Sequence, residues 1–219
     1  MAHTAGGDHQ WIHALLPLSL LAATGVWLRL HWDRIPARFP THWDLAGNAN
    51  GWSTRTIGGV FQPLVVGAAV CSMLMFIRFA ISEGLPARSG QRNVRTQTLR
   101  LLSGVAYLMS LLFSVISLQP LFPEHPSPPW LIVFVLTGTA ALAIPVIRAA
   151  APDSPAAPAT PDDAWKLGVF YYNPSDPAVM VEKRFGIGYT PNFGNRMSWF
   201  LMAAIIFLPL AAIFFRKIG

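Results

Sequence analysis

The 219-residue chain is 53% hydrophobic and only 12% charged, with a net charge of +6 and a mean hydropathy of +0.44. Because a soluble domain carries about 25% charged residues, this composition argues against an ordinary soluble protein and favours membrane-spanning helices. The basic excess does not indicate a nucleic-acid-binding protein, since no such motif accompanies it and basic residues beside membrane spans contact anionic lipid headgroups. The only cysteine, Cys71, cannot form an intrachain disulfide.

Five apolar runs predict five membrane-spanning helices, because about 20 apolar residues cross a bilayer core. The predicted spans are Trp11–Leu30, Gly58–Ile81, Leu99–Leu118, Trp130–Ile147 and Ser198–Phe215. We interpret the first run as an uncleaved helix, because it lacks the positive n-region of a secretory signal and exceeds the length of a signal's apolar core. The expected fold is an all-α integral membrane protein of about five transmembrane helices, with a small β-hairpin-like aromatic unit between the fourth and fifth helices.

The spans divide the chain into four parts. Residues 1–148 form a four-helix membrane domain that includes a polar loop at 31–57. An Ala/Pro-rich linker at 149–164 is expected to be extended and mobile by composition. A small unit at 165–196 precedes the fifth membrane helix, which lies within 197–219.

The distribution of basic residues predicts how the helices cross the membrane, because Lys and Arg concentrate on the cytoplasmic side. One face carries ten of them: Arg78, Arg88, Arg92, Arg95, Arg100, Arg148, Lys166, Lys183, Arg184 and Arg196. The other carries six: Arg29, Arg34, Arg38, Arg55, Arg216 and Lys217. This bias places the 31–57 loop outside and the small unit inside.

The external loop contains His-Trp-Asp twice. The side chains of His31, Asp33, His42 and Asp44 could supply nitrogen and oxygen ligands to a divalent metal, and an Asp–His pair could act as a general base. The spacing matches no zinc pattern, and neither Cys nor a third nearby His assists. No Ser or Cys nucleophile stands out either.

A structural interpretation of the same loop competes with the chemical one. Trp27, Trp32, Trp43 and Trp52 are spaced around it and would form an interfacial aromatic belt. The histidines and aspartates would then be solvated partners or loop caps. We favour this interpretation and expect no metal and no cofactor.

The second half of the loop resembles a known family. Pro40, His42, Trp43, Gly47 and Trp52 match the pattern Pro, residue, His, aromatic, then Gly and a later aromatic. This pattern is similar to the N-terminal membrane domain of the SdpI-type toxin-immunity proteins of bacteria, over about residues 15–80. The usual lysine after the final aromatic is replaced by 53–55, STR, and the C-terminal half is unlike SdpI itself. The resemblance implies a bacterial inner membrane and makes these residues, with the adjacent Asp44, candidates for binding a ligand.

The small unit Trp165–Arg196 is rich in aromatic residues and in turn formers. The density of Gly, Pro and Asn makes a long helix there improbable. Val169–Tyr172 and Ala178–Lys183 are typical of two short strands, with Asn173–Asp176 turning between them. Pro174 suits the second position of a type I turn, and Asn173 can cap its own backbone.

The same unit is similar to a small domain of unknown function found behind this kind of membrane region. The matching runs are 172–177, YNPSDP, and 181–194, VEKRFGIGYTPNFG. That resemblance implies no activity. Its polar and aromatic positions are candidates for contacting a partner: Asn173, Asp176, Lys183, Arg184, Tyr189 and Asn192. Lys183 and Arg184 could hold a phosphate, but a juxtamembrane headgroup is the favoured contact.

Two functions remain open from the sequence. The favoured one is a non-enzymatic, ligand- or peptide-binding or sensing protein of immunity type, whose partners would be the lipid bilayer, a peptide toxin and a cytoplasmic regulator. The alternative is a metal-dependent membrane enzyme or transporter that uses His42 and Asp44. Transport has little support, because ion pathways are marked by buried ionisable residues and the spans contain almost none.

Overall fold

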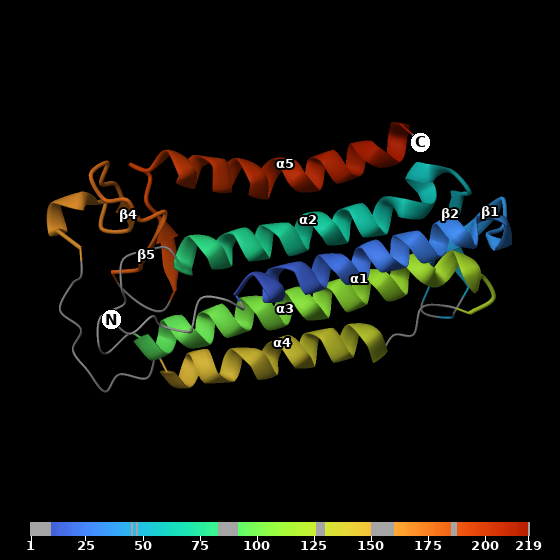
Figure 1. The fold of residues 1–219 in the computed structure, drawn as a ribbon, viewed down its shortest axis with the longest axis horizontal. Helices are drawn as coiled ribbons and strands as arrows, with labels where there is room; N and C mark the ends of the chain where they lie inside the picture. The colour runs from blue at the N-terminus through green and yellow to red at the C-terminus, as the bar shows by residue number, and fades with distance from the viewer. Residues whose placement is uncertain are drawn as a thin grey trace, which may run out of the picture. The chain divides into compact units, whose positions relative to one another are not determined.

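The structure is a computed structural model that describes residues 10–44, 46, 48–82, 92–125, 130–149, 160–184 and 188–218. Five α-helices contain most of the described residues (Figure 1). They are α1 Gln10–Leu30, α2 Ile57–Ser82, α3 Arg92–Leu118, α4 Trp130–Ala149 and α5 Arg196–Ile218. Three single-turn 3₁₀ helices accompany them: η1 Trp32–Arg34, η2 Gln119–Leu121 and η3 Asp162–Ala164.

Three helical stretches are long and apolar enough to cross a membrane, namely Ile57–Ser82, Asn93–Leu121 and Trp130–Ala149. In α1 and α5 the described apolar stretches are shorter, Leu15–Leu30 and Arg196–Phe207. The protein therefore has the helices of a membrane protein. All five predicted spans are helical, and in the part of the chain that the structure describes three of the five have the length and composition of a span.

The N-terminal end of α3 differs from the prediction. The helix begins at Arg92, seven residues before the predicted span Leu99–Leu118. Arg95 explains this start, because its guanidinium donates hydrogen bonds to the carbonyl oxygens of Ile81 (2.9 Å) and Ser82 (2.5 Å) at the end of α2. A cation there pairs with carbonyls that have no intrahelical partner.

The chain divides into two compact units. The first contains Met1–Ser72, Val105–Gly138 and Phe207–Gly219. Its buried core is apolar: Leu21, Leu28, Ile35, Phe39, Val60, Leu64 and Cys71. α2 and α3 approach closely within it, because a Cβ on Gly67 would lie 2.7 Å from the Phe113 side chain.

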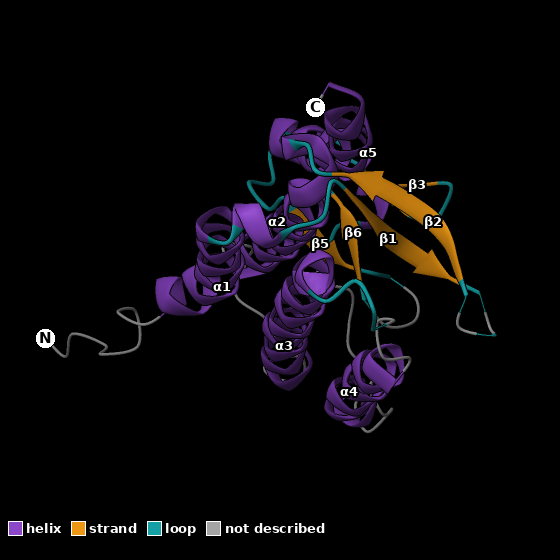
Figure 2. Ribbon diagram, turned by 90° about the vertical axis from the view of Figure 1, so that its right-hand side faces the viewer, coloured by secondary structure: helices purple, strands orange, loops and turns teal. Residues whose placement is uncertain are grey.

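The predicted 31–57 loop is not an irregular loop in the structure. It contains an antiparallel hairpin of β1 Arg38–Trp43 and β2 Ala49–Thr54 (Figure 2). Pro40 makes the first strand hard to predict from the sequence, since proline inside a run normally counts against a strand. Burial of Phe39 and Pro40 in the first unit outweighs that preference and forms the hairpin.

The second compact unit contains Met73–Gly104 and Thr139–Ile206. Within it lie two short antiparallel hairpins: β3 Trp165–Lys166 with β4 Phe170–Tyr171, and β5 Met180–Glu182 with β6 Tyr189–Pro191. The prediction that 169–172 and 178–183 are joined as one hairpin is therefore wrong, although both contain a strand. β4 pairs instead with β3 and β5 pairs with β6, and the side chain of Asn192 bonds to the turn between β4 and β5.

The core of this small folded part consists of Ala164, Trp165, Tyr171, Ala178 and Val181. The predicted turn is present, since the Asp176 amide donates to the Asn173 carbonyl (3.3 Å) and the Ser175 amide donates to the Asn173 side chain (3.0 Å). The linker expected at 149–164 lies mostly outside the described residues, and its end forms η3.

Candidate functional site

The β1–β2 hairpin brings the two ends of the family-like pattern together. Pro40 lies directly opposite Trp52, and His42 lies opposite Gly51. A Cβ on Gly51 would come within 2.8 Å of the His42 Cβ, so glycine permits this close pairing. The register is irregular on both sides of His42, which is typical of β-bulges that redirect a side chain. The pattern therefore describes one folded hairpin.

The exposed face of the hairpin carries two polar pairs. The His42 Nδ1 and Asn50 Oδ1 atoms are 2.5 Å apart. An amide oxygen only accepts hydrogen bonds, so Nδ1 is the donor and the Nε2 of a neutral ring remains an acceptor. The guanidinium of Arg38 lies over the Trp52 ring, 4.8 Å from its centroid, while that indole is 44% exposed. The hairpin thus offers an aromatic surface, a fixed cation and an oriented imidazole.

Asp44 has a structural role at the turn of this hairpin. Its Oδ1 accepts hydrogen bonds from the amides of Ala46 (2.9 Å) and Asn48 (2.8 Å), and its Oδ2 accepts one from the Asn48 side chain (3.3 Å). An aspartate that bonds backbone amides two and four residues on is a turn cap. Trp43 is half-buried beside it, opposite Ala49. The candidate Gly47 lies outside the described residues.

The two His-Trp-Asp repeats have different roles. His31 directly follows the end of α1. Its Nδ1 lies 2.9 Å from the Trp27 carbonyl oxygen, and its ring packs on the Trp27 indole with 4.1 Å between the ring centroids. Asp33 is exposed in η1. Among the residues that the structure describes, no three His, Cys, Asp or Glu side chains are grouped closely enough to hold a metal ion.

In the small unit, Asn192 is a structural hub. Its side chain is fully buried, and its Oδ1 accepts hydrogen bonds from the amides of Asn173 and Gly194, each at 3.0 Å. Its Nδ2 donates to the carbonyls of Asn173 (2.9 Å) and Asp176 (3.1 Å). All four hydrogen-bonding positions of the amide are therefore occupied within the chain. Asn192 therefore links the Asn173–Asp176 turn to the segment that follows β6. Its amide has no hydrogen-bonding position left for a ligand.

Tyr171 and Asp176 form a second buried pair in the same network. The phenol is 1% exposed and donates to the Asp176 Oδ2 at 2.8 Å, while the Asp176 Oδ1 accepts from the Ala178 amide at 2.9 Å. Burial raises the pKa of Tyr171 to about 12, with the bond to Asn173 opposing this and the bond to Asp176 adding to it. Asn173 donates to the same phenol at 3.2 Å. Three of the candidate contact residues, Asn173, Asp176 and Asn192, thus stabilise the fold of the small unit.

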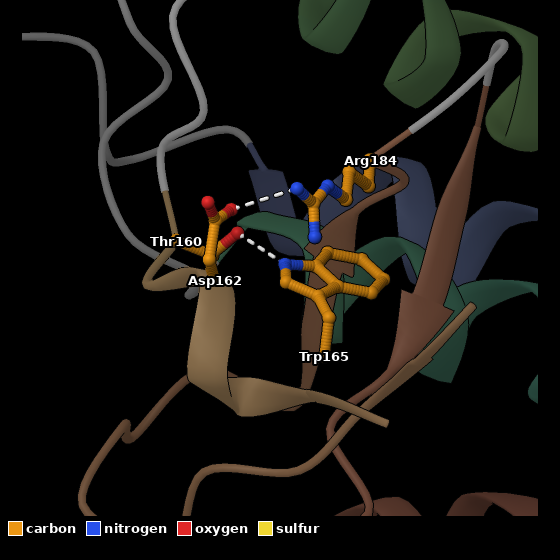
Figure 3. A network of polar contacts seen from close by, with 4 residues as sticks. All are labelled: Thr160, Asp162, Trp165 and Arg184. Carbon is orange, nitrogen blue, oxygen red and sulfur yellow. Dashed lines mark hydrogen bonds and ion pairs between the residues drawn. The ribbon is translucent and has the colours of Figure 1, made fainter. Parts of the chain in front are cut away.

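The remaining candidates of the small unit lie nearer its surface. Arg184 forms an ion pair with Asp162 (3.0 Å), next to the hydrogen bond from the Trp165 indole to Thr160 (2.8 Å), as Figure 3 shows. These contacts hold the end of the linker on the unit. Lys183 is exposed, and its amide donates to the Gly188 carbonyl (3.0 Å).

Tyr189 is half-buried in β6, opposite Glu182. Burial raises its pKa to about 12; the charge of Glu182 adds to this and that of Arg95 opposes it. Its phenol oxygen is buried and has no hydrogen-bond partner among the residues that the structure describes.

Two residues on the exposed face of the hairpin, Asn50 and Arg38, were not predicted from the sequence as candidate site residues. Asn50 is not among the residues that the sequence singles out, and in the structure it lies within β2 although Asn-Gly usually marks a turn. Arg38 was counted only as a loop charge, although it stacks on Trp52. Exposed and half-buried residues alternate along β2 in the structure, but its sequence, ANGWST, carries no matching alternation of apolar and polar residues that could have predicted the strand.

Comparison with known families gives two matches. Residues 18–67, which contain the β1–β2 hairpin, match the model DUF1648, described as a domain of unknown function. Residues 174–199, which contain β5, β6 and the start of α5, match DUF5808, described as a family of unknown function. No curated protein and no solved structure matches the chain. The two matches coincide with the two regions in which the sequence resembled known families.

Proposed function

We propose that this chain is a non-enzymatic protein of the bacterial inner membrane that binds a peptide on the exposed face of the β1–β2 hairpin. The observation that supports the proposal is the pairing of Arg38 with Trp52 and of His42 with Asn50 on that face. Both pairs contain residues of the pattern that resembles the SdpI-type toxin-immunity proteins. We infer an immunity or sensing role from that resemblance.

The hairpin suits a peptide ligand for physical reasons. A two-stranded sheet leaves strand edges to which an extended peptide can add, and among the described residues β2 pairs only with β1. The indole of Trp52 offers a large, rigid apolar contact, and tryptophan and arginine are enriched where binding energy is concentrated. The buried Phe39 and Pro40 hold the strand in place, so little ordering is required on binding.

The small unit is proposed to contact the membrane surface or a cytoplasmic regulator through Lys183 and Arg184. Asn173, Asp176 and Asn192 are assigned to its internal network. No observation on the described residues favours the metal-dependent alternative.

A challenge of living cells tests the proposal. Sensitive bacterial cells that produce the chain, and matched cells with an empty vector, are exposed to the peptide toxin that SdpI-type proteins neutralise. A photoreactive residue at the exposed Thr54 tests contact, with the same residue at exposed Ser175 as the control. Survival with cross-linking only at Thr54 would support the proposal. Equal killing with no cross-link at Thr54 would overturn it, and cross-linking without survival would leave binding but reject immunity.

A further inference from the structure

The β3–β4 hairpin ends in an apolar tip with an unfavourable backbone. Leu167 has φ +52° and Gly168 has φ +73°, and the Val169 amide donates to the Lys166 carbonyl at 3.3 Å. Two consecutive positive φ angles are typical of a type I′ turn, which favours Asn-Gly. A left-handed conformation is unfavourable for a residue such as leucine, because its Cβ comes too close to the following carbonyl oxygen. Packing against the protein does not offset this unfavourable backbone conformation, since the Leu167 side chain is 89% exposed.

The apolar surface continues from this tip along β4. Val169 is 59% exposed and Phe170 is 48% exposed. The Phe170 ring contacts the Phe193 ring edge to face at 5.7 Å between centroids, and the Phe193 ring contacts Trp199 in the same way at 5.7 Å. The Trp199 indole also donates to the Phe193 carbonyl at 3.1 Å. A chain of three aromatic rings therefore fixes the hairpin to the first turns of α5.

The first turns of α5 are themselves apolar and uncovered. Trp199 is 57% exposed and Phe200 is 66% exposed, and Asn195 caps the helix through the Met197 amide (2.9 Å). Leu167 lies only three residues from Phe170, so at about 3.3 Å per residue the Cα atoms of the two residues are at most about 10 Å apart. The hairpin tip is therefore connected to the start of α5 through the contacts of Phe170 and Phe193.

We propose that the β3–β4 tip, formed by Leu167, Val169 and Phe170, inserts into the lipid interface beside the start of α5. The exposed aromatic side chains at the start of an apolar helix suit the membrane–water boundary. Lys166 at the base of the turn is exposed, and its Nζ donates to the Asp163 carbonyl at 2.8 Å. Because an ammonium group has three donors, it can also bind anionic headgroups. The nearby carboxylate of Asp162 is already paired with Arg184. Burial of Leu167 in lipid accounts for keeping a large apolar residue at a position that favours asparagine or glycine.

Fluorescence quenching by lipid tests this assignment on the full chain. Cys71 is replaced by alanine, and a single cysteine at residue 167, 169 or 175 is labelled with the fluorophore NBD in proteoliposomes of phosphatidylcholine and phosphatidylglycerol. Lipids brominated near the glycerol end of their chains serve as the quencher. We expect blue-shifted emission and loss of intensity at residues 167 and 169. The Ser175→Cys label, on an exposed turn of the same unit, should show neither.

A second variant separates insertion from folding. Leu167→Asn keeps a residue that accepts positive φ but removes the apolar side chain. With the label at residue 169, this variant should lose most of the lipid quenching while the protease resistance of the unit is unchanged. A blue shift without quenching would mean that protein, for example a second copy, covers the tip and would overturn the proposal. Water-like emission at residue 167 would overturn it as well. Neither result depends on whether the β1–β2 hairpin binds a peptide.

Discussion

His42 and Asn50 come from opposite strands of the β1–β2 hairpin, and their Nδ1 and Oδ1 atoms are 2.5 Å apart. The contact exists because the register is displaced on both sides of His42, which leaves both side chains on the exposed face. An imidazole that is oriented by one ring nitrogen presents the other in a defined direction. The pair is therefore the most specific polar feature of the hairpin.

Replacement of His42 by alanine should impair peptide binding without unfolding the protein. The side chain is exposed, so its hydrogen bond contributes only about 0.5–1.5 kcal/mol to stability. Loss of one oriented contact to the peptide should lower affinity about tenfold, equivalent to about 1.4 kcal/mol. The control is His125→Ala, an exposed histidine next to η2. Equal effects of the two replacements on cell protection would remove any special role for His42.

The basic bias predicts the orientation of the chain. A cysteine at Asn50, in a Cys71→Ala background, should react with a membrane-impermeant reagent added to intact cells. A cysteine at Ser175 should react only after the cells are opened. Both positions are exposed, so reactivity reports the side of the membrane rather than burial. Protection at Asn50 together with labelling at Ser175 would invert the topology.

Asn192→Ala should destabilise the small unit strongly. It removes the partner of two amides and two carbonyls at once. Because each buried polar group left without a partner costs about 1–3 kcal/mol, the loss should be at least about 3 kcal/mol. Ser175→Ala, which removes no side-chain hydrogen bond that the structure describes, is the control. Thermal unfolding in detergent should show a lower transition for the small unit in the first variant and no change in the second.

Gly188→Val should destabilise the same unit through the backbone. Gly188 has φ +115°, and although no atom lies within 4 Å of the position that a Cβ would take, a β-branched residue resists this conformation. We expect a cost of about 1–3 kcal/mol without loss of membrane insertion. Limited proteolysis of the wild type should cut first in 149–164. In the variant, cuts within 169–183 should appear early, and an unchanged pattern would contradict the prediction.

The small unit should lose stability at alkaline pH. The folded-state pKa of Tyr171 is raised from 10.0 to about 12, so folding favours the neutral phenol. The stabilisation is complete below about pH 10 and is lost as pH rises towards about 12. Near-ultraviolet circular dichroism and tyrosinate absorbance measure the transition. Tyr171→Phe should be less stable at neutral pH, because Asp176 loses its donor, but should lose less on going to alkaline pH. An equal alkaline loss in both proteins would reject the assignment to Tyr171.

The sequence alone predicted the features that depend on local composition. Runs such as Gly58–Ile81 lie close to α2, because a long apolar segment must form its hydrogen bonds internally as a helix in lipid. The turn at Asn173–Asp176 was also predictable, since proline and asparagine act on their own backbone. Those interactions need no partner from elsewhere in the chain.

Pairing between segments was decided by the tertiary structure. Residues 169–172 and 178–183 were expected to pair with each other, but the buried amide of Asn192, distant in sequence, bonds to the turn between them and joins it to β6. In the 31–57 region, burial of Phe39 against residues of α1 and α2 converts a presumed loop into a strand despite Pro40. Local propensities differ by about 1 kcal/mol, whereas burying a large side chain or satisfying several buried polar groups contributes several times more. Side-chain burial and buried hydrogen bonds between distant segments therefore decide which strands pair.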